Sequence, residues 1–205
     1  MKEEKTITYI DGYNLYFGLK DKGWKRYYWL NLQALAQNLL KPDQVLIHTK
    51  YFTTRVSNPP SKVKRQSTYI EALETLSDFS IYFGHYRPNI KTCPKCNYIH
   101  SVPKEKMTDV NIAVELLTDA FENKFDTAIL ISADSDLVGM IKSILRLFPL
   151  KRIIVVFPPD RYSVALNTVA SASFIIGRKK LAKSVFPDNV KKADGFVLTR
   201  PMRWY

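Results

Sequence analysis

The sequence predicts an α/β fold in which a mostly parallel sheet of five or six strands lies between two layers of helices. Short apolar runs alternate with segments of helical period along almost the whole chain. This alternation is typical of a parallel sheet that is covered by helices on both faces. Apolar residues make up 46% of the 205 residues, which is enough to build the core of such a three-layer sandwich.

The N-terminal half begins with a strand predicted at residues 6–10, which ends at Asp11 and Gly12. Leucines and alanines recur at helical spacing through residues 30–40 and predict the first helix. A mixed apolar run at residues 44–54 predicts the second strand. After a Pro-Pro loop, residues 61–76 predict a helix that is basic at its start and apolar toward its end.

The C-terminal half continues the same alternation from a third strand predicted at residues 79–86. The remaining elements are expected in the order helix 108–123, strand 127–131, helix 137–148, strand 152–157, helix 162–170 and a short strand at 173–176. Crossovers between parallel strands should be right-handed.

Two segments depart from the alternation. Residues 89–106 contain both cysteines and have no clear period, so we predict an inserted loop or small knuckle there. Residues 177–205 carry eight Lys or Arg and two Asp, a surplus of 8 − 2 = +6, and predict a basic C-terminal tail after a domain that spans residues 1–176. The apolar patch at residues 195–201 is open to two interpretations: it docks on the domain, or it meets a partner chain in a homo-oligomer.

The net charge of +12 favours a polyanionic partner, with nucleic acid first. A soluble basic protein without such a partner is the alternative. No apolar run reaches the roughly 18 residues that a membrane-spanning helix needs. The N-terminus has neither the apolar region nor the cleavage pattern of a signal peptide. We therefore expect a cytoplasmic protein without a membrane partner.

Acidic residues follow the ends of two predicted strands. Asp11 ends the first strand, Asp134 and Asp136 directly follow the strand at residues 127–131, and Asp109 opens the helix before that strand. Ligands of open α/β sheets bind beyond the carboxyl ends of the strands. Carboxylates gathered there would repel one another, and a hard divalent cation such as Mg²⁺ or Mn²⁺ relieves that conflict. Helix capping and ordinary turn chemistry are the alternative for each acid taken alone.

Three ordered motifs resemble those of the NYN-domain family, a LabA-like branch of the PIN-like nucleases. They are residues 9–16 (YIDGYNLY), 105–110 (EKMTDV) and 130–137 (LISADSDL), and the resemblance covers residues 9–157. Each motif falls in a strand–turn–helix context, and the three together are far more specific than any one alone. The resemblance implies a Rossmann-like, PIN-like sandwich and an RNA-cleaving site that depends on Mg²⁺ or Mn²⁺.

The resemblance also implies roles for individual residues. The catalytic and metal-binding cluster would consist of Asp11, Asp109, Asp134 and Asp136. Supporting positions would be Asn14, Ser132, Glu105 and Lys106. Ala133 departs from the family pattern, in which Gly is frequent, and its methyl group would tighten the turn that aims Asp134.

Aromatic and basic residues are interleaved between the first predicted strand and the first predicted helix, and a second basic set lies at Arg55 and at the start of the helix predicted at residues 61–76. Such a mixture suits base stacking and phosphate binding of single-stranded RNA. The candidate contact residues are Tyr13, Tyr16, Lys25, Arg26, Arg55, Lys62, Lys64 and Arg65. Filling of the core by several of the rings, and a simply solvated basic helix face, are the alternatives.

The pair Cys93 and Cys96 has the spacing of half a zinc site, with His85 and His100 as the nearest further ligands. A structural Zn²⁺ held by these four residues is one interpretation, and two unligated surface thiols are the other. A redox pair is disfavoured because no helix pattern opens directly after Cys93.

The function predicted from these features is hydrolysis of RNA phosphodiester bonds by metal-activated water, as in an endoribonuclease. The alternative is a non-catalytic RNA-binding or regulatory module on the same fold. A phosphatase of the haloacid-dehalogenase type is disfavoured because Asp11-Gly12-Tyr13 lacks the second Asp of that nucleophile motif. A dinucleotide-binding site is disfavoured because no Gly-x-Gly-x-x-Gly follows the first strand.

Overall fold

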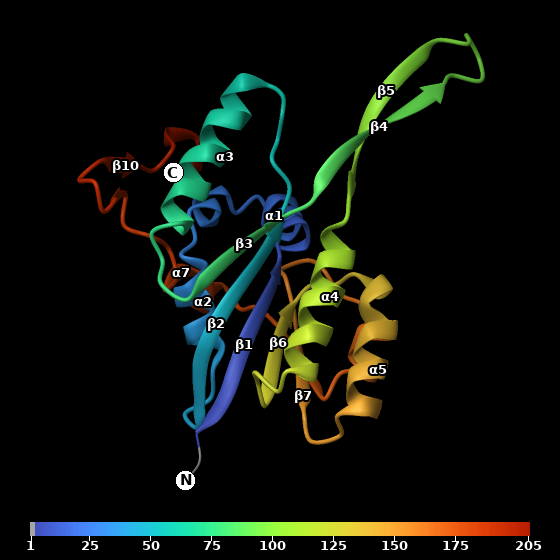
Figure 1. The fold of residues 1–205 in the computed structure, drawn as a ribbon. Coiled ribbons are helices and arrows are strands. Elements are labelled where there is room, and N and C mark those ends of the chain that lie inside the picture. Colours follow the sequence, from blue (N-terminus) through green and yellow to red (C-terminus); the bar gives the residue numbers. More distant parts are fainter. Residues whose placement is uncertain (1–2) are drawn as a thin grey trace.

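A six-stranded sheet forms the centre of the protein (Figure 1). The computed structural model describes residues 3–205, with the side chains of residues 86–92 and 99–105 excepted. The sheet order is β3-β2-β1-β6-β7-β8, and every pair of neighbouring strands is parallel. The strands are β1 (Glu4–Asp11), β2 (Gln44–Thr53), β3 (Phe79–Phe83), β6 (Thr127–Ile131), β7 (Arg152–Phe157) and β8 (Ala172–Ile175). The predicted parallel α/β sandwich is confirmed.

Helices cover both faces of this sheet and bury two separate apolar clusters. One face is covered by α1 (Gly12–Asp21), α2 (Leu32–Leu39), α3 (Pro60–Leu73) and α7 (Arg178–Ala182). The other face is covered by α4 (Thr108–Phe121), α5 (Val138–Leu147) and α6 (Val164–Val169). Within the described part of the chain, no helix is both long and apolar enough to cross a membrane.

The order of the strands reverses between β1 and β6. The chain first builds the sheet outward from β1 through β2 and β3, and it later returns to place β6 on the free side of β1. Open α/β sheets bind ligands at this switch point, beyond the carboxyl ends of the strands. The residues that follow β1 and β6 therefore occupy the favoured position for a site.

Helix α1 was not among the predicted elements. Its sequence begins with Gly12 and contains Gly18, and an interior glycine such as Gly18 disfavours a helix by about 1 kcal/mol relative to alanine. The helix forms because Asp11 caps it and because Leu15 and Leu19 are buried against the sheet. Gly12 is required by a close approach, since a Cβ there would lie 2.7 Å from the carbonyl oxygen of Phe52.

Residues 89–106 are not the irregular loop that the sequence predicted. Strands β4 (His85–Thr92) and β5 (Ile99–Lys106) pair as a two-stranded antiparallel ribbon that projects from the body of the protein (Figure 1). Pro88 pairs with Pro103 in its register. The two strands pair with each other and not with the central sheet, and their sequence has no clear apolar period from which a strand could be predicted.

The basic C-terminal segment is folded onto the domain. It contains α7, β9 (Asn189–Lys191), β10 (Val197–Thr199) and a short 3₁₀ helix, η3 (Met202–Trp204). Four of its apolar residues join the core cluster on the α1 face: Leu181, Phe186, Val190 and Leu198. The basic residues between them remain largely exposed, so the surplus of charge does not prevent the segment from packing.

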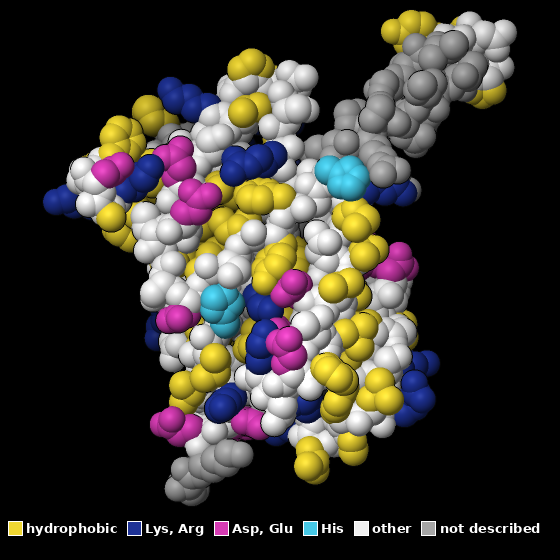
Figure 2. All heavy atoms as spheres, in the orientation of Figure 1, with side chains coloured by type: hydrophobic (Ala, Val, Ile, Leu, Met, Phe, Trp, Pro, Cys, Tyr) yellow, Lys and Arg dark blue, Asp and Glu magenta, His cyan; other side chains and the backbone are white. Residues whose placement is uncertain are grey.

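The outer face of α4 leaves a row of apolar side chains exposed. Val110, Val114 and Phe121 lie on this face, and Phe121 is 81% exposed. Figure 2 shows hydrophobic side chains running down this part of the surface. The opposite face of α4 buries Ile112, Leu116 and Ala120 against the sheet.

Candidate metal centre and adjoining cleft

Asp11 connects the end of β1 to the turn after β6. It is 1% exposed and accepts hydrogen bonds on both carboxylate oxygens. Oδ1 accepts from the backbone N–H of Asn14 at 3.0 Å, and Oδ2 accepts from the Asn14 amide at 2.5 Å and from the Ser132 hydroxyl at 2.8 Å. Burial raises the pKa of Asp11, while these three hydrogen bonds act in the opposite direction and the charge of Asp134 raises it further.

The turn after β6 is ordered by the same group of residues. The Ser132 oxygen accepts from the backbone N–H of Asp134 at 3.1 Å, and the Asn14 side-chain oxygen accepts from the N–H of Ala133 at 3.3 Å. Asp134 in turn caps the 3₁₀ helix η2 (Ser135–Leu137), since its Oδ1 accepts from the N–H of Asp136 at 2.9 Å. The orientation of the Asp134 carboxylate is therefore defined by hydrogen bonds on both sides of it.

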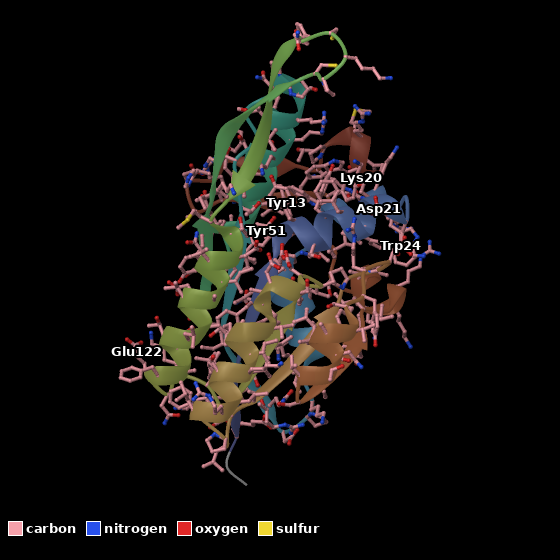
Figure 3. All side chains as sticks on the ribbon, turned by 90° about the vertical axis from the view of Figure 1, so that its right-hand side faces the viewer. Tyr13, Lys20, Asp21, Trp24, Tyr51 and Glu122 are labelled. Carbon is pink, nitrogen blue, oxygen red and sulfur yellow. The ribbon has the colours of Figure 1, made fainter. Side chains whose placement is uncertain are left out.

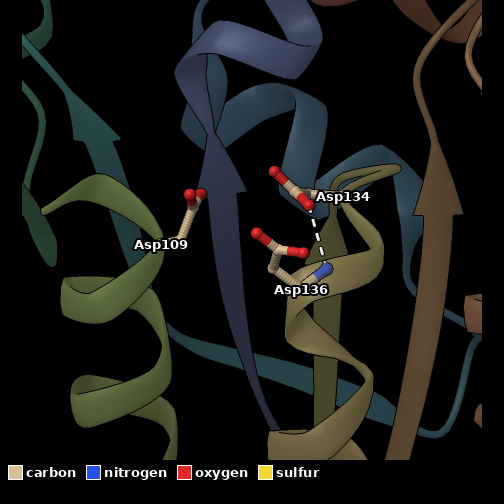
Figure 4. A group of neighbouring side chains, drawn as sticks. All are labelled: Asp109, Asp134 and Asp136. Atoms are coloured by element: carbon tan, nitrogen blue, oxygen red, sulfur yellow. Dashed lines mark hydrogen bonds between the residues drawn. The ribbon is translucent and has the colours of Figure 1, made fainter. Parts of the chain in front are cut away.

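Three carboxylates meet at this edge of the sheet. Oxygens of Asp109, Asp134 and Asp136 all lie within 4.8 Å of one another, and this group could hold a metal ion. Figure 4 shows Asp109 reaching across from the first turn of α4 toward Asp134 and Asp136. Asp109 and Asp134 are half-buried and Asp136 is exposed. A cation among them would offset their mutual repulsion, and an all-oxygen donor set suits Mg²⁺ or Mn²⁺.

Asp11 lies next to this group and is not a member of it. The predicted four-acid cluster is thus divided in the structure into three clustered carboxylates and one buried neighbour whose oxygens accept from Asn14 and Ser132. Asn14 and Ser132, expected as supports, make those contacts. Lys106 is exposed at the end of β5, and the side chain of Glu105 lies outside the described residues.

A cleft of about 600 Å³ begins beside Asp11 and extends along α1. It is lined by seven aromatic rings and five cationic side chains. The rings belong to Tyr13, Tyr16, Phe17, Tyr28, Tyr51, Tyr69 and Trp204. The cations are Lys20, Lys25, Lys62, Arg65 and Arg203. In Figure 3 the labelled Tyr13 and Tyr51 mark the end of the cleft near the sheet edge, and Lys20 marks the part farther along α1.

Five of the eight predicted nucleic-acid contacts line this cleft: Tyr13, Tyr16, Lys25, Lys62 and Arg65. The other three, Arg26, Arg55 and Lys64, do not line it. The guanidinium of Arg26 lies 5.7 Å from the ring centre of Tyr27, and that of Arg55 lies 4.5 Å from the ring centre of Phe83. Lys64 is exposed.

Lys20, Tyr51, Tyr69, Arg203 and Trp204 line the cleft but were not predicted from the sequence. Tyr51 lies within a strand, where an aromatic residue signals a core position. The mixture of cations and rings at residues 200–205 was the one available signal for Arg203 and Trp204.

The four residues considered for a structural zinc do not form one site. His85 pairs with Lys106 at the base of the ribbon, whereas Cys93 follows Thr92 at its tip. The eight residues of β4 span about 26 Å at the rise of an extended strand, which is far beyond the reach of a shared tetrahedral ion. The side chain of His100 lies outside the described residues, and Cys93 and Cys96 are free thiols. Backbone N–H groups of Lys95 and Cys96 lower the pKa of the Cys93 thiol.

Comparison with known proteins identifies the architecture. The family model described as the NYN domain matches residues 5–176. The chain is 28% identical over 199 residues to 6-hydroxy-3-succinoylpyridine 3-monooxygenase HspA of Pseudomonas putida, in a match that covers 80% of this chain and 62% of that protein. A crystal structure of a protein of unknown function from Vibrio parahaemolyticus has a TM-score of 0.60 at 18% identity, covering 90% of this chain and 98% of the other.

The match to the family model includes β1 with Asp11, the start of α4 with Asp109, and the turn that carries Asp134 and Asp136. It ends before the C-terminal segment that completes the cleft. Both the sequence motifs and the sheet topology thus agree on the assignment: the chain belongs to the NYN-domain family, a nuclease-like family of α/β proteins.

Proposed function

We propose that the protein is a ribonuclease that hydrolyses phosphodiester bonds of single-stranded RNA with the aid of Mg²⁺ or Mn²⁺. The observation that carries this proposal is the meeting of Asp109, Asp134 and Asp136 within 4.8 Å at the switch point of the sheet. These three carboxylates would hold the cation. When bound, the cation would supply charge neutralisation at the phosphate and lower the pKa of a water molecule.

The residues around the three acids have distinct tasks in this proposal. Asp11 accepts three hydrogen bonds and holds Asn14 and Ser132 in place. Ser132 fixes the backbone of Asp134 through its hydroxyl oxygen. The cations of the neighbouring cleft would attract the phosphate backbone of the RNA. In this proposal only the three clustered acids contact the cation, and the cation in turn binds the reacting phosphate.

A test compares cleavage of 5′-labelled single-stranded RNA with cleavage of matched single-stranded DNA and double-stranded RNA. We expect cleavage of the single-stranded RNA with Mn²⁺ or Mg²⁺ and none in the presence of a chelator. Intact RNA under all conditions, together with RNA binding that is independent of the metal, would instead support a non-catalytic RNA-binding module.

A second candidate function is oxygenation of a small heteroaromatic acid. It is suggested by the similarity to a pyridine monooxygenase and by the aromatic lining of the cleft. The chain covers 62% of that relative, and the donor set argues against this candidate. Non-haem iron oxygenases use two histidines and one carboxylate, whereas the group found among the described residues consists of three Asp. Oxygen consumption in the presence of a hydroxypyridine carboxylate would favour the oxygenase over the ribonuclease.

Replacement of Ser132 by Ala tests the positioning role. The variant loses the hydrogen bond to Asp11 and the acceptor for the N–H of Asp134. Loss of such an orienting partner typically weakens metal affinity or activity by about 10- to 100-fold. We expect a Mn²⁺ dissociation constant that rises within this range, measured by calorimetry, with an unchanged circular dichroism spectrum. An unaltered Mn²⁺ affinity would contradict the role of Ser132.

A further inference from the structure

We propose that the C-terminal segment completes a base-binding pocket in the cleft, with Trp204 as the ring on which a nucleobase next to the cleaved bond stacks. The inference rests on the proposed function, because it assumes a single-stranded nucleic acid as the ligand. It concerns a part of the chain that lies beyond the residues matched by the family model, which end at residue 176.

Trp204 is held at the wall of the cleft by three aromatic side chains from two other segments of the chain. Its ring centre lies 6.0 Å from that of Tyr28, 6.2 Å from that of Trp29 and 6.0 Å from that of Tyr69. The contacts with Tyr28 and Tyr69 are edge-to-face. A ring fixed by such neighbours loses little conformational entropy when a ligand stacks on it.

Arg200 anchors the backbone of this terminal segment. Its side chain is 9% exposed and donates to the backbone oxygen of Arg26 at 2.8 Å and to that of Trp204. The backbone N–H of Arg200 donates to the oxygen of Asp188 at 2.7 Å. These bonds tie η3 to the segment before α2, so Trp204 is part of the folded wall.

Helix α1 supplies further rings to the lining of the cleft. Tyr16 is 43% exposed and packs against Tyr28 at 5.1 Å between ring centres. Tyr13 and Phe17 lie on the same stretch of α1 and pack at 5.8 Å. The volume of about 600 Å³ falls in the usual range for small-molecule sites. Rings from α1 and from the C-terminal segment suit a planar base, because every base offers a face for stacking.

The positive charge of the cleft favours an anionic ligand. Five Lys or Arg side chains line it, and within the described residues no Asp or Glu does. Rings flanked by cations are the combination used to bind single strands, with stacking of the bases and electrostatic contact to the phosphates.

The inner end of the cleft lies beside Asp11, the buried neighbour of the three acids. Gly12 and Tyr13, which follow Asp11, line its inner end. Tyr51 lies there too, and burial together with the nearby Asp11 charge raises its pKa to about 12, so its hydroxyl stays neutral. A strand whose phosphate lies at the three acids would therefore place its adjacent nucleotide in this cleft.

The test measures binding in chelator, so that cleavage plays no part. The probes are a fluorescent single-stranded oligonucleotide and a matched abasic strand with the same phosphates. We expect tighter binding of the base-bearing strand and loss of that preference in Trp204→Ala. Stacking on an aromatic ring corresponds to a factor between about 5 and 150 per base, and we expect a reduction within that range.

Two variants serve as controls. Arg203→Ala should weaken binding of both strands equally, because phosphate contacts do not depend on bases. Phe196 belongs to the same segment, is 61% exposed and does not line the cleft. Phe196→Ala should therefore leave the affinity for both strands unchanged. Circular dichroism verifies that each variant is folded, and Trp204→Phe should retain part of the base preference.

The outcomes separate this inference from the proposed function. Base preference that depends on Trp204, without cleavage by the wild-type chain, supports the pocket and refutes the nuclease. Cleavage with a base preference that Trp204→Ala leaves intact overturns the pocket. Trp204-dependent binding of a free pyridine carboxylate, with no preference between the two strands, also overturns it.

Discussion

Asp134→Asn is expected to reduce RNA cleavage by at least about a hundredfold, since even residues that only orient a metal ligand typically contribute 10- to 100-fold. Asp134 offers an oxygen to the three-acid group and lies beside Asp136, across from Asp109 (Figure 4). The Asn side chain is almost the same size, and its oxygen can still accept from the N–H of Asp136. The substitution therefore removes one negative charge from the centre while the turn keeps its cap.

The measurement combines initial cleavage rates in Mn²⁺ with the Mn²⁺ affinity from calorimetry. Asp43→Asn is the matched control, because Asp43 is exposed and precedes β2 at the amino end of the strands, away from the three acids. We expect the control to cleave like the wild type. A fully active Asp134→Asn variant would rule out the three-acid group as the reaction centre.

Asp119→Ala is expected to lower the free energy of unfolding by about 3–5 kcal/mol, the usual cost of removing one partner from a buried ion pair. Asp119 on α4 is 1% exposed. Its Oδ2 lies 2.5 Å from the Lys50 ammonium on β2 and accepts from the Tyr9 hydroxyl on β1 at 2.6 Å. Lys50 also contacts Glu115 at 2.8 Å, so the loss of Asp119 leaves the buried ammonium with a single, more exposed carboxylate.

Urea unfolding at neutral pH measures this difference, and Lys50→Met combined with Asp119→Leu is the control. The double variant removes both charges and should recover much of the stability, because an apolar pair has no buried charge to desolvate. A single Asp119→Ala variant within about 0.5 kcal/mol of the wild type, the range of ordinary surface substitutions, would contradict the prediction.

The pH dependence of this stabilisation follows from Lys50. Burial lowers the pKa of its ammonium, but the hydrogen bonds to Asp119 and Glu115 and the charge of Asp119 outweigh burial and raise the pKa above its ordinary value of 10.5. A raised pKa means that the contribution to stability is complete below the ordinary pKa and is lost as the pH rises through the folded-state value. The difference in the free energy of unfolding between the wild type and Asp119→Ala should therefore persist through neutral pH.

The strand segments, their parallel direction and the position of the acids could be predicted because they depend on local patterns. Apolar runs of strand length identified β1, β6 and β7, and alternation with helices implied that the strands are parallel. Parallel strands bring their carboxyl ends to one edge, so Asp11 and Asp134 could be expected near each other from their positions alone.

The different roles of Asp11 and of the three clustered acids could not be predicted in this way. Asp11 and Asp134 both follow strands, yet Asp11 is buried under hydrogen bonds from Asn14 and Ser132. Which carboxylate remains available to a cation depends on contacts between residues more than a hundred positions apart, and no local pattern encodes them.

The sequence by itself determined the α/β class, the family motifs and the acidic edge, because each follows from short-range periodicity or from residues adjacent in the chain. Only the tertiary structure decided that Asp109, Asp134 and Asp136 group together, that residues 85–106 form a ribbon, and that the basic C-terminal segment packs on the core. The cleft is the clearest case. Trp204 meets Tyr28 and Tyr69 only after the chain has folded, since a wall built from distant segments exists only when the core brings them together.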